Sequence, residues 1–291
     1  MRFGISPIAV ALASVVPALA AAQGRVVERH RFVDPEGRLM AYYSSVLAYT
    51  AIDVSVPRRR WSAELGADVV YVPPLGEGQR RDAFGKPEAT NLAPVVPRPR
   101  AALALPGRAL LEASFTPPVR LFDLEANLVG VAISRPVVDS RALRVVPRVS
   151  YMSGTVSGAI TCTRKLLERN NHSDSVYFRR VCNGRPSNDH FNPRHLSVEL
   201  VASGPLRRGA LLPFAGMGLR RERTRFDIGV IRSDGSRDPD HPILELVATR
   251  PFGYAGASWR LGPRAIASSE LFYAPGSVLT VRMMASWRFR R

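Results

Sequence analysis

Aspartate and histidine residues stand close together at several points in the second half of the sequence. A carboxylate beside an imidazole can act as general acid and base in hydrolysis, provided the two side chains come within hydrogen-bond reach. The neighbours are His172 and Asp174, Asp189 and His190, and a group formed by Asp234, Asp238, Asp240 and His241. Such neighbours are common by chance in polar loops. We therefore predict no catalytic residue and keep a surface hydrolase as the alternative hypothesis.

The run 234–240 is rich in side-chain oxygens, as calcium loops are. It lacks the twelve-residue order and the final glutamate of a helix–loop–helix calcium site. We predict a solvated loop, with no metal and no cofactor.

The two cysteines, Cys162 and Cys182, are the next candidates for chemistry. A lone pair in an exported protein is expected to form a disulfide. Closing a loop of about 20 residues would restrict the unfolded chain by roughly 3 kcal/mol. A metal site with His172 or His190 is the alternative, but no CxxC spacing supports zinc. We predict a disulfide that stiffens an outer loop.

A third set of charged residues alternates with apolar residues, and we expect it to face the inside of a barrel. It comprises Glu64, Asp68, Glu112, Arg144, Arg148, Glu199, Arg220, Glu222, Glu270 and Arg282, together with Arg98, Arg100 and Arg288. The two signs nearly balance. Ion pairs could fill a narrow interior, because charges there avoid lipid, or arginine rows could line a pore that favours anions. We favour the filled interior.

Period-two alternation from Trp61 onward predicts the strands that would position these charges. In the last segment, Leu279, Val281 and Met283 alternate with Thr280 and Arg282. We expect ten strands, at about 61–71, 98–105, 111–115, 123–135, 143–149, 196–202, 211–229, 243–261, 264–274 and 279–289.

One helix is expected before the strands. Asp34-Pro35-Glu36 combines a cap residue, a proline suited to the first turn and an acid near the positive helix end. Apolar residues follow at helical spacing, which predicts a helix over 35–49. We expect it at the periplasmic side, in or under the mouth of a barrel, or otherwise on the membrane surface.

Connections between the expected strands alternate in length. Long ones fall at 73–97, 156–193 and 230–242, and short ones at 106–107, 137–141, 204–209 and 262–263. Residues 117–122 are expected to form a medium loop, and 275–276 a short connection on the long side. Long outer loops alternating with short periplasmic turns are typical of outer-membrane barrels.

Aromatic residues fall near the expected strand ends. Trp61, Trp259, Trp287 and Phe289 would lie at the periplasmic side, and Tyr71, Phe115 and Tyr273 each stand two residues before a proline at the other side. Two aromatic girdles around an apolar band are typical of two lipid–water interfaces.

The amino terminus predicts export. Residues 1–22 combine one early arginine, an apolar stretch and a small-residue end, as in a secretory signal peptide. We expect a periplasmic segment with the helix at 23–60, and a barrel at 61–291.

Composition narrows the partners. The 291 residues carry a net charge of +17, and 46% hydrophobic content excludes a disordered chain. Such an arginine-rich chain could meet nucleic acid or lipid phosphate. No nucleic-acid module is present, so we expect no nucleic acid and assign the charge to two rims and an ion-paired interior.

The chain resembles bacterial outer-membrane β-barrel proteins in four features. These are the signal peptide, the strands with period-two alternation, the two aromatic girdles and an aromatic residue near the end of the last strand. The resemblance implies an all-β, up-and-down antiparallel transmembrane barrel in the bacterial outer membrane. Its implied partners are the lipid bilayer, lipopolysaccharide and the outer-membrane assembly machinery. The class usually ends on the aromatic itself, whereas Phe289 is followed by Arg290 and Arg291.

Two function classes remain besides a soluble periplasmic barrel. The first is a monomeric, non-enzymatic surface or porin-like protein that binds or passes a small solute, through a side opening or a narrow lumen. The alternative is a surface hydrolase that uses the loop Asp/His residues, resembling the ten-stranded omptin proteases or a lipid hydrolase.

Overall fold

The computed structural model describes residues 25–51, 60–75, 93–140, 142–164, 167, 182, 185–204, 210–231, 234–236, 238 and 241–289. The expected signal peptide lies outside these residues. So do His172, Asp174, Asp240, Arg290 and Arg291.

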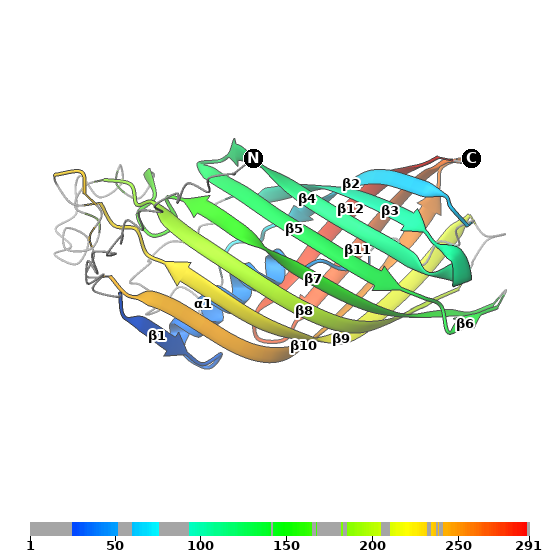
Figure 1. The fold of residues 1–291 in the computed structure, drawn as a ribbon, viewed down its shortest axis with the longest axis horizontal. Coiled ribbons are helices and arrows are strands. Elements are labelled where there is room, and N and C mark those ends of the chain that lie inside the picture. The colour runs from blue at the N-terminus through cyan, green and yellow to red at the C-terminus, as the bar shows by residue number, and fades with distance from the viewer. Residues whose placement is uncertain are drawn as a thin grey trace, which may run out of the picture.

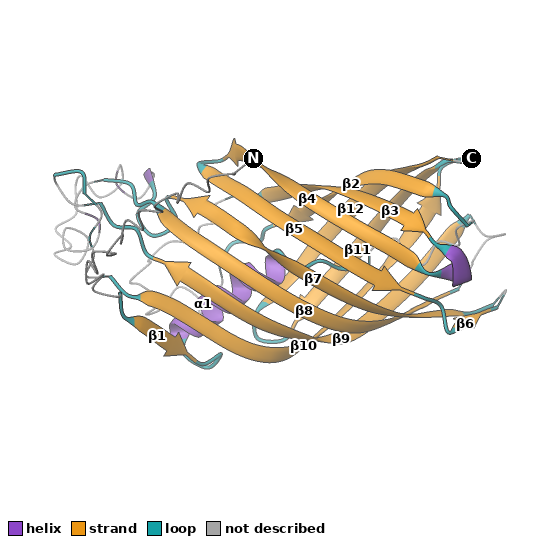
Figure 2. Ribbon diagram, viewed as in Figure 1, coloured by secondary structure: helices purple, strands orange, loops and turns teal. Residues whose placement is uncertain are grey.

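Ten antiparallel strands form a closed barrel (Figures 1 and 2). They are β2 (Ala63–Tyr71), β3 (Val95–Ala104), β4 (Leu110–Leu121), β5 (Leu124–Ser134), β7 (Arg144–Gly158), β8 (Asp189–Ser203), β9 (Leu211–Asp227), β10 (Ile243–Arg260), β11 (Ala265–Ala274) and β12 (Val278–Phe289). Pairing of β12 with β2 closes the ring. The prediction of a ten-stranded up-and-down barrel is confirmed.

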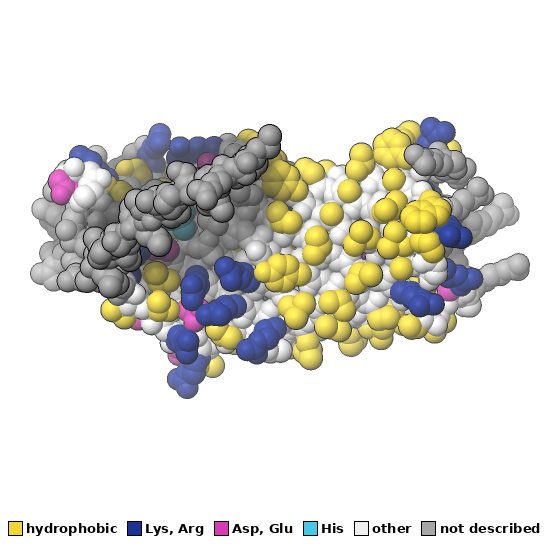
Figure 3. Space-filling view, in the orientation of Figure 1, with side chains coloured by type: hydrophobic (Ala, Val, Ile, Leu, Met, Phe, Trp, Pro, Cys, Tyr) yellow, Lys and Arg dark blue, Asp and Glu magenta, His cyan; other side chains and the backbone are white. Residues whose placement is uncertain are grey.

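The alternation of side chains explains why these segments are strands. On β12, Leu279 and Met283 are 55% and 62% exposed, whereas Thr280 and Arg282 are 2% and 0% exposed. The exposed apolar side chains form a belt around the barrel (Figure 3). A large exposed apolar surface is unfavourable in water and suits lipid.

The two ends of the barrel differ. The turn end carries the short helix η1 (Pro106–Arg108), the two-residue strand β6 (Val138–Asp139) and the β10–β11 and β8–β9 connections. The opposite end carries the connections that follow β2, β7 and β9, which are the longest, and we name it the long-loop end. Trp61, Trp259, Trp287 and Phe289 are exposed near the turn end, and Tyr71 and Tyr273 near the long-loop end.

Two strands reach further than expected at the long-loop end. Phe115 does not end its strand, because β4 continues past Pro117 and Pro118 through a bulge. It then turns tightly at Phe122 and Asp123, whose φ angles are 53° and 65°. The expected medium loop at 117–122 was therefore wrong.

The expected loop 156–193 is also shorter, because β7 runs to Gly158 and β8 starts at Asp189. Asp189 and His190 are therefore strand residues, whereas we expected them in the loop.

The amino-terminal segment passes through the barrel. Strand β1 (Val27–His30) pairs in parallel with the start of β10, at the long-loop end. Arg25 anchors it there, pairing with Asp227 and donating to the His241 carbonyl at 2.7 Å. At the turn end, the Trp61 amide donates to the Ala104 carbonyl at 2.8 Å. The segment's first strand thus completes the edge of β10 at the end opposite the turn end. The side of the membrane on which each end lies stays a prediction.

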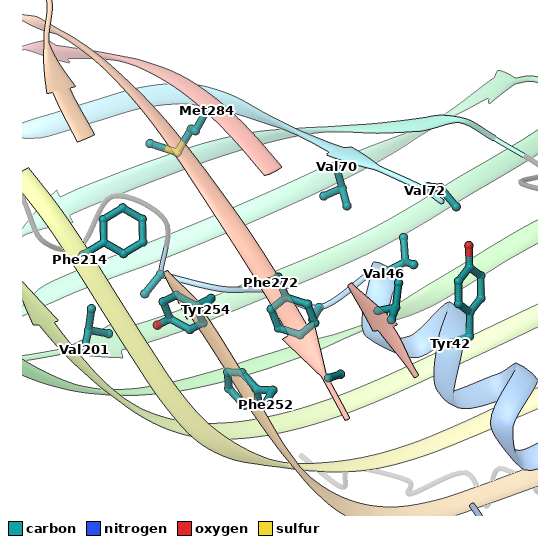
Figure 4. Close-up of a cluster of buried hydrophobic side chains, with 14 of the residues drawn as sticks. Tyr42, Val46, Val70, Val72, Val201, Phe214, Phe252, Tyr254, Phe272 and Met284 are labelled. Atoms are coloured by element: carbon teal, nitrogen blue, oxygen red, sulfur yellow. The ribbon is translucent and has the colours of Figure 1, made fainter. Parts of the chain in front are cut away.

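Helix α1 (Pro35–Val46) lies inside the barrel (Figure 1). It is shorter than the expected 35–49 and is buried on nearly all sides, including Leu39, Met40, Tyr42 and Val46. Figure 4 shows Tyr42 and Val46 among wall residues of the interior apolar cluster. No helix in the described part of the chain is long and apolar enough to cross a membrane.

The threaded topology predicts that Val26 is accessible from outside the cell, since long loops face outward in this class of barrel. In intact cells, Val26→Cys should react with a maleimide carrying a polymer too large to enter the periplasm. The native cysteines will not interfere, because they are joined in a disulfide. Arg108→Cys, in η1 at the turn end, is the matched control and should react only after lysis. The reverse pattern would refute the topology.

Candidate functional site

Buried ion pairs of the barrel wall contact the helix segment. Asp68 accepts from Arg98 Nε at 3.0 Å and also pairs with Arg100. The ring of Tyr49, just beyond α1, lies 4.5 Å from the Arg100 guanidinium and 4.7 Å from that of Arg148. These arginines therefore contact carboxylates and an aromatic face at once, which favours burial of their charge.

Arg148 bridges two acids across the interior. Its Nε donates to Glu112 at 2.7 Å, and its Nη1 pairs with Glu199. Tyr254 also donates to Glu199, at 2.6 Å. Arg148 additionally donates to the carbonyl of Tyr49, so this pair network also holds the segment beyond α1.

Two further groups hold the segment in place. Ser44 donates to Glu222 at 2.8 Å and contacts His195, while Arg250 pairs with the same Glu222. Thr50 donates to Glu270 at 2.8 Å and accepts from Arg282.

The predicted inward set occupies the interior, with two members at a mouth. Six acids are buried there (Glu64, Asp68, Glu112, Glu199, Glu222 and Glu270) beside six arginines (Arg98, Arg100, Arg148, Arg220, Arg250 and Arg282), so the interior is close to neutral. Arg144 and Arg288 lie at the turn end, where they pair with Asp139 and Glu64. Arg220 is fully buried, with its guanidinium over the rings of Phe252 and Phe272.

Sequence reasoning missed the contribution of the amino-terminal segment. Ser44, Tyr49 and Thr50 each contact charged wall residues, and Arg250 was not singled out. Their signal in the sequence is weak, because a serine or tyrosine in a short helix region is common.

The wall has an incomplete pairing between β3 and β4. Only Arg100–Ala104 pairs with Leu110–Ser114, the fewest paired positions of any neighbours in the barrel. Beyond them, Val95–Pro99 of β3 and Phe115–Leu121 of β4 do not pair with each other. This unpaired stretch, the β3–β4 seam, lies toward the long-loop end.

Prolines explain the seam. In antiparallel pairs, every second residue bonds to the same neighbour. Leu105 bonds to Ala109 across the hairpin, whereas Ala104 bonds to Ser62 on the other side. The amides at the odd positions of β3, and their partners on β4, would therefore face the seam. Pro97, Pro99 and Pro117 occupy three of the next four donor positions, 97, 99, 115 and 117, and have no N–H to give.

An apolar cavity of about 300 Å³ opens at the seam. Its outer lining includes Val95, Pro97, Pro99, Val119 and Leu121, from both edges of the seam. Its inner lining includes Tyr43, Val46 and Leu47 of the helix region, with Ala126, Val156 and Phe191 of the wall. The amino-terminal segment thus forms the floor of a pocket that reaches through the barrel wall.

The Cys162–Cys182 disulfide is formed, with Cα atoms 5.6 Å apart. Beside it, buried Asp189 accepts from the amides of Thr161 and Gly229, the latter at 2.7 Å. Asp189 therefore ties loop segments together.

The predicted Asp/His neighbours are only partly brought together. Asp189 is buried, while His190, the next strand residue, contacts Ser157 at 3.0 Å, so the two side chains point to opposite faces. Asp238 and His241 do lie close, at 3.5 Å. Within the described residues, no group of three or more His, Cys, Asp or Glu could hold a metal ion.

Comparison with solved structures returns similar barrels. The chain is similar to Ail, the attachment invasion locus protein of Yersinia pestis, at 8% identity over 79% of this chain and 100% of that chain, with a TM-score of 0.33. For the translocator domain of NalP from Neisseria meningitidis, the values are 8%, 87%, 94% and 0.36. For the toluene transporter TodX of Pseudomonas putida, they are 10%, 92%, 78% and 0.32. No protein-family model and no curated protein matches the sequence.

The closed ten-stranded barrel, with its apolar outer belt and charged interior, defines a bacterial outer-membrane β-barrel protein. The likenesses to solved structures concern the barrel alone.

Arg148→Met should destabilise the protein by about 3–5 kcal/mol, because it leaves Glu112 and Glu199 buried without their cation. Urea unfolding from lipid vesicles measures this. Arg120→Met, at an exposed arginine, is the control and should cost less than about 1 kcal/mol. Adding Glu112→Gln and Glu199→Gln to Arg148→Met should recover part of the loss, and failure of all three variants to differ would refute the network.

Proposed function

We propose that this protein binds a small apolar molecule in the seam cavity and passes it between the outer leaflet and the barrel interior. The molecule is of the hydrocarbon or acyl-chain type, and no covalent chemistry is involved. The observation that carries the proposal is an apolar cavity that opens through the wall where prolines interrupt the pairing of β3 with β4.

The chemistry of the lining supports an apolar ligand. Valine, leucine, proline, alanine and isoleucine dominate the lining, together with Tyr43 and Phe191. The cavity of about 300 Å³ is at the small end of ligand sites, which span about 300–1,000 Å³. A hydrocarbon that enters the cavity from the lipid moves from one apolar environment to another, so van der Waals contacts with the lining would hold it there.

The interior supports a sideways route over a route along the barrel axis. The amino-terminal segment lies in the lumen and is held by hydrogen bonds to buried charged groups of the wall: Ser44 donates to Glu222, Thr50 donates to Glu270, and Arg98 donates to the carbonyl of Leu47. A porin-like passage would need this segment to leave or move. A sideways route needs only the seam, which already lacks its ladder hydrogen bonds.

A photoreactive fatty acid in lipid nanodiscs tests the binding site. Irradiation should crosslink it to peptides that contain the seam residues, and Ala126→Phe should abolish this labelling by filling the cavity. Ala113→Phe, on the lipid-facing side of β4, is the matched control and should leave the labelling unchanged. Labelling spread evenly around the belt in all three proteins would contradict the proposal.

The prolines supply a second test. Pro97→Val, Pro99→Val and Pro117→Val combined should restore three ladder donors, slow hydrogen exchange at the seam and reduce the labelling. Pro251→Val, in β10, is the control, because its amide would face away from the β9 ladder. Undiminished labelling with a protected seam would show that the ligand enters elsewhere.

The filled lumen makes a separate prediction for the axial route. Wild-type protein in a planar bilayer should show no discrete conductance steps, since the segment 35–51 occupies the interior. Steady ion-conducting steps would favour a porin-like pore over the sideways route.

A further inference from the structure

A second groove lies on the outer surface of the barrel, on β7, β8 and β9 near the long-loop end. It has a volume of about 320 Å³ and is lined by Ser153, Gly154, Thr155, Asn192, Arg194, Arg223 and Arg225. We call it the arginine groove. It shares no lining residue with the seam cavity.

The arginine groove is strongly positive. Arg29 and Arg221 stand beside it. Arg29 contacts Glu245 and Arg221 contacts Thr249, and both of these β10 residues pair with β9, one of the strands of the groove. Glu245 is the acid that contacts the group, accepting from Arg223 and Arg225 at 3.0 and 2.9 Å and from Arg29 at 3.2 Å. Three arginines thus contact this one carboxylate, and Arg194 lies in register beside Arg223, so arginines outnumber the acid that they share.

The ion pairs orient the arginines and leave them accessible. Glu245 is 1% exposed, whereas the side chains of Arg223 and Arg225 are 52% and 50% exposed. The contacts to Glu245 use the Nε atoms of both arginines. Their outer guanidinium nitrogens are therefore held near one another with donors to offer, an arrangement suited to phosphate.

The height of the groove on the wall identifies the phosphate carrier. Arg194 pairs in register with Ser153 and Arg223. Two residues nearer the turn end, the outward-facing row consists of Tyr151, Leu196 and Arg221. The next outward-facing row consists of Val149, Val198 and Leu219. The arginines thus stand directly above the apolar belt, and Figure 3 shows basic side chains gathered at this border.

We propose that the arginine groove binds the phosphorylated glucosamine headgroup of lipopolysaccharide in the outer leaflet. The acyl chains of such a lipid would run down the apolar rows of β7, β8 and β9, while its phosphate meets Arg194, Arg223 and Arg225. The hydroxyls of Ser153 and Thr155 and the amide of Asn192 supply sugar contacts in the same groove. A soluble polyanion has no acyl chains and would not contact the apolar rows beneath the arginines.

Titration of the detergent-solubilised protein with lipid A, followed by native mass spectrometry, tests this site. Wild type should bind diphosphoryl lipid A at least about tenfold more tightly than lipid A stripped of both phosphates, a difference of about 1.4 kcal/mol. Arg194→Gln should weaken binding several-fold. Arg194→Gln, Arg223→Gln, Arg225→Gln and Glu245→Gln combined should abolish the preference, and the last change avoids leaving Glu245 buried without its cations.

The matched control replaces three arginines at the turn end, Arg108, Arg260 and Arg264, by glutamine. This variant should bind diphosphoryl lipid A as wild type does. Heat-dependent gel migration will show whether each variant retains a folded barrel.

Equal binding by all folded variants, or equal binding of phosphorylated and stripped lipid, would overturn the proposal. So would arginine-dependent binding of a sulfated polysaccharide without any binding of lipid A. Because the seam cavity is left intact in every variant, fatty-acid labelling there should be unchanged. Failure of one proposal is thus distinguishable from failure of the other.

Discussion

Every backbone amide that faces lipid needs a hydrogen-bond partner, because hydrocarbon offers none. The closed ladder from β2 round to β12 meets this requirement, which is why alternating sequences here become a barrel and not separate hairpins. The β3–β4 seam is where the requirement is relaxed, and it is relaxed by removing donors through proline. A wall opening made in this way leaves few unpaired N–H groups to destabilise it.

The barrel interior obeys a related constraint, since charges removed from water need opposite charges or hydrogen bonds. Five of the six buried arginines pair with buried acids there, and the sixth, Arg220, lies over the rings of Phe252 and Phe272. These charged groups also offer acceptors and donors to the helix region. Ser44, Tyr49 and Thr50 use them. The close approach of Tyr49 to the wall also depends on Gly130, where a Cβ atom would lie 3.2 Å from the tyrosine ring. The helix region and the charged interior of the wall therefore depend on each other for their positions.

The strands could be predicted from the sequence because the pleat puts successive side chains on opposite faces, and lipid and lumen demand opposite chemistry. The inward acids and the disulfide follow from the same local rules. Pro117 misled the prediction of β4, since proline usually ends a strand and here sits at a bulge beside an open edge. The path of the helix could not be predicted, because its polar partners come from strands up to 237 residues away, as in the Ser45–Arg282 contact.

The amino-terminal segment enters at one mouth and joins β2 at the other, which has a consequence for biogenesis. Two routes lead to this arrangement: the ring closes around the segment as β12 meets β2, or the leading end of the segment threads through the finished ring from the turn end. By either route β1 reaches its place beside β10 only when the chain that follows it lies in the lumen, so the parallel β1–β10 pairing marks a barrel whose interior is already occupied.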